Sequence, residues 1–206
     1  MRYLIFVLIS TVLLACSTPE NKKTTIALQP LNSFPNDLQD TIKLAIKNFY
    51  GFDVITFKDT NIPKEFYTTI KSPRYRADSI IHYLKSNKPD SIDYIIGLTK
   101  TDIATTKKDK NGNIKKPTNK YKDWGIFGLG FRPGASCVVS TYRLKHKEQK
   151  TAIARLKKVV MHELGHNLGL SHCPNKNCLM QDAAETIKTI DKVKLNLCQD
   201  CTIQGN

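Results

Sequence analysis

In the first quarter of the chain, the spacing of the hydrophobic side chains changes from that of a strand to that of a helix and back to that of a strand. Residues 24–28 (TTIAL) and residues 52–57 (FDVITF) are rich in β-branched and aromatic side chains, which predicts strands. Between them, residues 35–50 carry apolar side chains three or four positions apart, the spacing of a helix with one buried face. Gly51 then ends this helix, because glycine adopts the left-handed conformation that follows many helices.

The middle of the chain continues with alternating helices, strands and loops. A helical spacing covers residues 76–84, and residues 91–99 form a near-continuous apolar run that suits a buried strand. Residues 105–123 are rich in lysine and contain Asn-Gly and Pro turn signals, which indicates a loop. Residues 124–131 and 137–144 are predicted to pair as strands around an Arg-Pro-Gly turn.

Two helices are predicted in the last third of the chain, one over residues 148–169 and one over residues 183–197. Together with the strands they predict an α+β fold, an α/β-type sandwich in which a twisted mixed sheet packs against the long helix. Residues 24–206 are then a single domain, long enough to enclose a proper core. Residues 170–206 would form a small C-terminal subdomain of it.

The sequence HELGHNLGLSH places three histidines where they can bind one metal ion. His162 and His166 are four positions apart and therefore lie on one face of a helix. Gly169 lets the chain turn sharply out of that helix, which brings His172 round as a third nitrogen ligand. Three protein ligands leave the fourth tetrahedral position of zinc open, as in catalytic sites. Glu163 would stand beside a water at that position as the general base for peptide-bond hydrolysis.

Four cysteines follow in two pairs, which also suits a metal. Their positions are Cys173, Cys178, Cys198 and Cys201, so that C-x4-C and C-x2-C pairs can share one tetrahedral ion. Disulfides within each pair are the alternative if the protein is exported to an oxidising compartment. Zinc taken up during folding would protect the thiolates, because metal binding and folding are coupled.

The whole pattern, HExxHxxGxxHC-x4-C-x-M-x17-C-x-x-C, resembles the archaemetzincins, a branch of the metzincin clan of zinc metallopeptidases. The resemblance implies a metzincin-like fold, one catalytic zinc ion and one structural zinc ion held by the four cysteines. It also implies that Met180 belongs to a Met-turn, a hydrophobic floor under the zinc histidines, which is a packing role and not a catalytic one. Some metzincins place a tyrosine just after this methionine, but here Gln181 and Asp182 follow, so no residue is identified as an oxyanion donor.

In metzincins the strand above the active-site helix offers its free edge to extended substrate. Residues 125–131 (GIFGLGF) resemble such an edge, because their glycines offer backbone with little side-chain obstruction. The alternative is an ordinary strand whose glycines mark a bulge.

The N-terminus resembles that of an exported lipoprotein. Residues 1–15 have signal-peptide proportions, with one positive charge and an apolar stretch too short for a stable bilayer anchor. Leu-Leu-Ala before Cys16 resembles a bacterial lipobox, which predicts a lipid on Cys16, residues 16–23 as a tether, and attachment to the bacterial cell envelope. A plain secretory peptide and an uncleaved anchor helix are the alternatives.

Charge adds little to this interpretation. The formal net charge is +14, which fits either a solvated lysine-rich surface or attraction to anionic membranes and acidic partners. No nucleic-acid-binding motif accompanies the charge, so no nucleic-acid partner is expected. Cys137 is expected to be a small buried hydrophobic residue. His82 and His146 lie outside any ligand spacing.

The sequence thus predicts a monomeric zinc-dependent metallopeptidase that acts on peptides or proteins. The alternative is a catalytically weak or inactive zinc-binding module that binds peptides at the cell envelope. Glu163 favours the enzyme, because a module without activity would be free to lose this residue. Endopeptidase and aminopeptidase activity both stay open, since no residue is dedicated to a free amino terminus.

Overall fold

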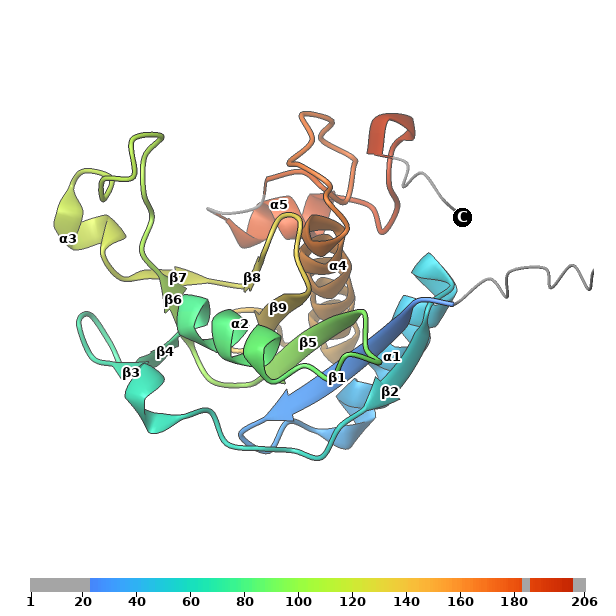
Figure 1. Ribbon diagram of the computed structural model, residues 1–206. Coiled ribbons are helices and arrows are strands. Elements are labelled where there is room, and N and C mark those ends of the chain that lie inside the picture. The colour runs from blue at the N-terminus through green and yellow to red at the C-terminus, as the bar shows by residue number, and fades with distance from the viewer. Residues whose placement is uncertain (1–22, 183–185, 202–206) are drawn as a thin grey trace, which may run out of the picture.

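Two mixed β-sheets form the core of the part that the computed structural model describes, residues 23–182 and 186–201 (Figure 1). The first sheet has the strand order β2-β1-β5-β9-β8, with four parallel strands and an antiparallel edge strand, β8. Its strands are β1 (Thr25–Leu31), β2 (Asp53–Thr56), β5 (Tyr94–Thr99), β8 (Gly128–Gly130) and β9 (Ser136–Ser140). The second sheet, of order β3-β4-β6-β7, contains β3 (Tyr67–Thr68), β4 (Arg74–Arg76), β6 (Ile103–Thr105) and β7 (Trp124–Ile126).

Helices cover both faces of the first sheet. They are α1 (Asn36–Tyr50), α2 (Ala77–Ser86), the short α3 (Thr118–Tyr121), α4 (Gln149–Asn167) and α5 (Ile187–Lys192), with 3-10 turns η1 (Lys64–Phe66) and η2 (Gln199–Cys201). Successive residues of a strand point to opposite faces, so Ile96 joins the core with α1 and α4, whereas Ile95 joins the core with α2. The sandwich places α4 directly behind β8 and β9 (Figure 1).

The prediction of one strand over residues 124–131 is wrong in one respect, because these residues form two strands that belong to different sheets. Residues Trp124–Ile126 pair with β6, whereas Gly128–Gly130 pair with β9. The chain therefore crosses from one sheet to the other at Phe127. A single sheet was expected, and the second sheet escaped prediction because its strands are only two or three residues long.

Three other boundaries also differ from the prediction. The strand from residue 137 ends at Ser140, whose hydroxyl accepts a hydrogen bond from Tyr142 N and starts a turn. The long helix ends at Asn167, and Gly169 takes the left-handed conformation (φ 95°) that was expected of it. The last predicted helix shrinks to α5, because Val193 is extended and Lys194 N donates to Asn177 O.

The predictions for the N-terminus lie outside the described residues. These are the signal peptide (1–15), the lipidated Cys16 and most of the tether (16–23), which stay predictions together with the envelope location. The part of helix 183–197 that covers 183–185 is likewise not described. Among the residues that are described, the search for a helix long and apolar enough to cross a membrane finds none.

Candidate metal centre and catalytic cleft

Three histidines converge at the C-terminal end of α4. One ring nitrogen from each of His162, His166 and His172 lies within 4.8 Å of the other two. The first two project from the same face of the helix, and the turn at Gly169 brings the third back toward them. The Nε2 atoms of His166 and His172 are 3.2 Å apart, so these two nitrogens face each other.

The backbone fixes the orientation of two of these rings. Nδ1 of His162 lies 2.8 Å from the carbonyl oxygen of Leu179, and Nδ1 of His166 lies 2.8 Å from that of Leu170. A carbonyl only accepts, so each Nδ1 carries the proton and each Nε2 keeps its lone pair. Burial lowers the pKa of His162 to about 4 and lowers that of His166 as well. Both rings are therefore neutral near pH 7, and the donor set fits a divalent cation such as zinc.

Glu163 lies next to this cluster in a pocket made by the backbone of β8. The residue is only 8% exposed, and its side chain packs on Gly128. A Cβ atom added at position 128 would come within 2.8 Å of its Oε1, too close for any other residue to fit without movement. Burial raises the pKa of this carboxyl to about 8, although a hydrogen bond from the backbone of Gly130 opposes the shift.

The glycines of β8 therefore allow the active-site helix to pack close to the strand. A Cβ at Gly130 would come within 2.8 Å of the carbonyl oxygen of Glu163. Gly128 and Gly130 pair in unbroken register with Val139 and Cys137 of β9, so they mark no bulge. The other edge of β8 has no partner strand among the described residues and faces the cleft. Of the two interpretations of this segment, the structure supports a free edge for residues 128–130.

Met180 lies beneath the helix, on the side away from β8. Its side chain is fully buried, and a Cβ atom at Gly165 would come within 2.6 Å of its Sδ. Gly165 is the third residue after His162 in the helix. Because glycine has no side chain, the thioether packs directly on the helix backbone at this position. The contact is one of packing, and the role of Met180 in a Met-turn under the histidines stays a prediction.

The four cysteines form a second cluster beside the first. The Sγ atoms of Cys173, Cys178, Cys198 and Cys201 all lie within 4.8 Å of one another, and all four residues are free. Cys173 Sγ lies 3.6 Å from Cys198 Sγ, a contact that joins the two pairs. Backbone N–H groups of Met180 and Cys198 point at Cys178 Sγ at 3.4 Å each. Such donors stabilise thiolates, and the geometry fits one tetrahedral ion.

A cleft of about 540 Å³ contains the histidine cluster. It is lined by β8, α4, Leu179 and α5, and its apolar side chains include Val159, Ile190 and Val193. Lys107, Lys158 and Arg132 bring positive charge to its rim. Arg132 Nη1 donates to Ser171 Oγ at 2.5 Å.

The structure thus brings together eight of the nine predicted site residues, the exception being Cys16, which is not described. Cys137 is buried in β9, as expected, and its pKa is raised by burial. His82 packs on Phe131, and His146 accepts a hydrogen bond from Glu148 N, so neither joins the clusters. Sequence reasoning missed the separate parts that Gly128 and Gly165 play. The two-residue spacing of Gly128 and Gly130 was the available signal, since it places both on one face of a strand.

Known proteins are similar to this chain in sequence and fold. Archaemetzincin from Halobacterium salinarum is 27% identical over 185 residues, which cover 85% of this chain and 96% of that protein. Archaemetzincin from Haloquadratum walsbyi is 28% identical over 185 residues, with the same coverage. The crystal structure of archaemetzincin from Methanopyrus kandleri superposes with a TM-score of 0.70 at 25% identity, over 89% of this chain and 93% of that one. That of archaemetzincin from Archaeoglobus fulgidus gives 0.68 at 24% identity, over 86% and 98%.

A family model described as Peptidase family M54 matches residues 60–204, which include both clusters of candidate metal ligands and the edge strand β8. The match covers well over half of the chain. We conclude that the chain belongs to Peptidase family M54.

Proposed function

We propose that this protein is a zinc metallopeptidase in which His162, His166 and His172 hold the catalytic zinc ion and Glu163 is the general base. One observation carries the proposal: a buried carboxyl group lies beside three converging imidazoles, in a cleft whose wall is an unpaired strand edge. Family membership and similarity to the archaemetzincins support it.

The metal ion and the protein side chains would supply different parts of the hydrolysis chemistry. When bound, zinc supplies Lewis acidity, which lowers the pKa of a coordinated water toward neutrality and polarises a carbonyl. Glu163 takes a proton from the attacking water at its carboxylate and passes it to the leaving amine nitrogen. Without metal, burial raises the pKa of this carboxyl to about 8, and the positive charge of a bound zinc ion would favour the ionised form that a general base needs. The carbonyls of Leu179 and Leu170 keep the histidine rings in place throughout.

Substrate would bind along β8. We propose that an extended peptide pairs with the free edge of Gly128–Gly130, so that main-chain hydrogen bonds place its scissile bond over Glu163. A side chain next to that bond would enter the apolar end of the cleft between Val159, Ile190 and Val193.

The four cysteines would hold a second, structural zinc ion. Their mutual distances and the N–H donors around Cys178 support this assignment over disulfides within the pairs. The ion would fix the segment from residue 173 to residue 201, which includes Leu179 and Met180, the two residues under the histidines.

Cleavage of a diverse peptide library by zinc-loaded protein lacking residues 1–16 tests the proposed activity. Glu163→Gln is the matched control, because it keeps the shape of the side chain and removes the base. Cuts that are absent with the control would establish the peptidase, and their positions would separate internal from terminal cleavage. A filled histidine site without any cuts would contradict the proposal and favour a module that only binds peptides.

A further inference from the structure

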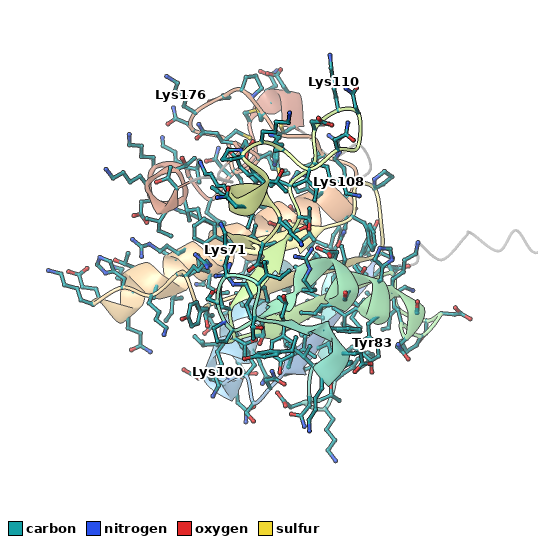
Figure 2. The ribbon with its side chains drawn as sticks, turned by 90° about the vertical axis from the view of Figure 1, so that its left-hand side faces the viewer. Lys71, Tyr83, Lys100, Lys108, Lys110 and Lys176 are labelled. Carbon is teal, nitrogen blue, oxygen red and sulfur yellow. The ribbon has the colours of Figure 1, made fainter. Side chains whose placement is uncertain are left out.

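Seven lysines gather on one projection next to the cleft. We name residues 106–122 the lysine arm; it connects β6 to β7, carries α3 and contains a single carboxylate, Asp109. Six of the seven lysines are exposed, namely Lys108, Lys110, Lys115, Lys116, Lys120 and Lys122, whereas Lys107 is half-buried. Figure 2 shows Lys108 and Lys110 on the side of the molecule formed by the arm. The arm therefore carries a surplus of positive charge with almost no acidic neighbours of its own.

The lysine arm is an ordered structure and not a loose loop. Lys107 N donates to Tyr121 O at 2.9 Å, and Lys115 N donates to Lys107 O at 3.0 Å, which ties the two sides of the arm together. Asp109 bonds to the backbone of its own turn, because its Oδ1 accepts hydrogen bonds from Asn111 N at 2.9 Å and Asn113 N at 3.0 Å. The one carboxylate of the arm is thus engaged with backbone and does not pair with the exposed lysines.

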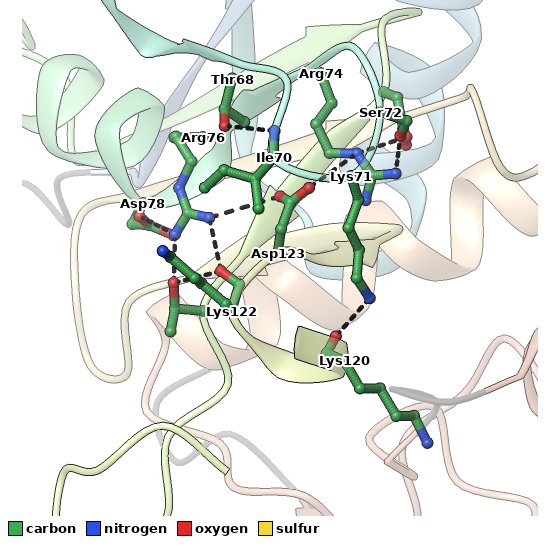
Figure 3. A network of polar contacts seen from close by, with 12 residues as sticks. Thr68, Ile70, Lys71, Ser72, Arg74, Arg76, Asp78, Lys120, Lys122 and Asp123 are labelled. Atoms are coloured by element: carbon green, nitrogen blue, oxygen red, sulfur yellow. Dashed lines mark hydrogen bonds and ion pairs between the residues drawn. The ribbon is translucent and has the colours of Figure 1, made fainter. Parts of the chain in front are cut away.

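Polar contacts fasten the base of the arm to the second sheet (Figure 3). Lys71 Nζ donates to Lys120 O at 2.8 Å, and Arg76 Nη2 donates to Thr106 Oγ1 at 2.9 Å. Asp123, fully buried just beyond the arm, lies 3.8 Å from Arg76 Nη1. The backbone that carries the lysines is consequently anchored to the sheet at the base of the arm.

The arm begins at one end of the catalytic cleft. Lys107 lines the same cavity as Glu163, and its Nζ lies 4.7 Å from the centre of the Trp124 ring. Trp124 is the first residue of β7, and β8 follows after Phe127, so the arm meets the cleft where β8 starts. A peptide that pairs with β8 and leaves at this end would run toward the arm. Figure 1 shows the arm and the segment with α5 rising on the same side of the sheets, with β8 between them.

We propose that the lysine arm binds an acidic segment of the polypeptide substrate, located on one side of the scissile bond. The proposal rests on the proposed peptidase function and adds to it a class of substrate. Charges of one sign, without acidic neighbours, attract carboxylates over about 10 Å at moderate salt and raise the rate of productive encounter. Because the arm lies at only one end of β8, acidic residues on the other side of the cleavage point gain nothing from it.

Three peptides that share one neutral cleavable core test the proposal. The first has neutral ends, the second has four glutamates after the core, and the third has four glutamates before it. We expect one acidic peptide to exceed the neutral one in kcat/KM by about tenfold at low salt, and the advantage to shrink as salt is added. Equal values for the two acidic peptides would overturn the proposal.

Two variants with the same change in charge locate the effect. Replacing four arm lysines by glutamine should reduce the ratio of kcat/KM for the acidic peptide to kcat/KM for the neutral peptide to near one. These four are Lys108, Lys110, Lys115 and Lys116. The control replaces four exposed lysines outside the arm by glutamine and should leave this ratio unchanged. These four are Lys43, Lys47, Lys147 and Lys150. Circular dichroism checks that both variants fold. An advantage that survives in the arm variant, or disappears equally in the control, would contradict the proposal.

A binding measurement separates this proposal from the proposed activity. In the Glu163→Gln protein, fluorescence anisotropy of a labelled acidic peptide reports binding without cleavage, and loss of that binding in the arm variant supports the arm. Cleavage of the neutral core by the unaltered protein tests the peptidase function alone. If the arm variant binds the peptide normally but loses affinity for vesicles of phosphatidylserine and phosphatidylcholine, the arm is a membrane contact and the proposal fails.

Discussion

The carboxylate of Glu163 rests on the bare backbone of Gly128, at a distance that leaves no room for a side chain at position 128. The strand that would receive substrate and the residue that would move the proton are therefore one packed unit. A substitution in either one should therefore alter the position of the other.

Gly128→Ala should displace the Glu163 carboxylate and lower kcat/KM by about 10²-fold, since misplacement by about 1 Å can cost that much. Peptide cleavage assays and zinc analysis check this, and the zinc content should not change. Gly51→Ala is the control: it has nothing within 4 Å of the new Cβ but a φ of 73°, so it should cost stability and keep activity. Full activity in Gly128→Ala would show that the carboxylate tolerates a different position.

Glu163 should make the metal-free protein less stable as pH rises. Its pKa is about 8 when folded and near 4.5 when unfolded, so the unfolded state loses the proton first. The free energy of unfolding should then fall between pH 4.5 and 8, relative to Glu163→Gln, by about 1.4 kcal/mol per pH unit at most. Urea denaturation of both proteins at several pH values measures the difference, in which the opposing contribution of His162 cancels. A difference that is independent of pH would mean that the carboxyl is ionised when folded.

Gly165→Ala should lower the free energy of unfolding by about 1–3 kcal/mol, because the new methyl group overlaps the Met180 thioether. Met180→Ala alone should also destabilise the protein, by leaving a cavity. The double variant should be more stable than the sum of the two predicts, by about 1 kcal/mol. Denaturation of all four proteins completes the cycle, and strict additivity would rule out the contact.

Arg155 attaches α5 to the active-site helix through a two-pronged ion pair with Asp191. Its Nε and Nη2 atoms lie 2.7 and 2.8 Å from the two carboxylate oxygens. Arg155→Lys keeps the charge but loses the paired geometry, so stability should fall by about 1 kcal/mol, and KM should rise if α5 lines the substrate pocket. The pair lowers the pKa of Asp191, so its contribution to the free energy of unfolding is complete above the unfolded pKa of the carboxyl and is lost as pH falls through the lower, folded pKa. Asp191→Asn should therefore cost less stability at pH 3 than at pH 7.

Two zinc ions per chain are expected, one in each cluster. His166→Ala and Cys201→Ser should each remove one ion, measured by metal analysis of the purified proteins. Protein lacking residues 1–16 has five cysteines, all free in the structure, so denaturation with a chelator should release five reactive thiols. A single reactive thiol would show that the pairs form disulfides.

The sequence predicted well the features that depend on neighbours along the chain. Apolar periodicity located α1 and α2 to within one or two residues, and the histidine spacing located the metal cluster. Features set by tertiary contact were missed. No periodicity marks β3 or β4, which are short and exist because other strands lie next to them.

The last helix shows that spacing along the chain can also predict more helix than tertiary contacts allow. Helical spacing extends through residue 197, yet the helix stops at Lys192 because the chain must return to bring Cys198 to Cys178. Within the lysine arm the charges were visible in sequence, but their position at the end of the cleft depends on how β6 and β7 pair.

The hydrogen bond from His162 to the Leu179 carbonyl gives the catalytic centre a dependence on oxidation state. Leu179 stands between Cys178 and Met180, so its carbonyl is held in position only while the cysteine segment keeps its shape. Oxidants that convert those thiols to disulfides would pull this carbonyl away and release the ring. We therefore expect activity to be lost on oxidation of these thiols while both sheets stay folded, and to be kept while a metal ion covers them.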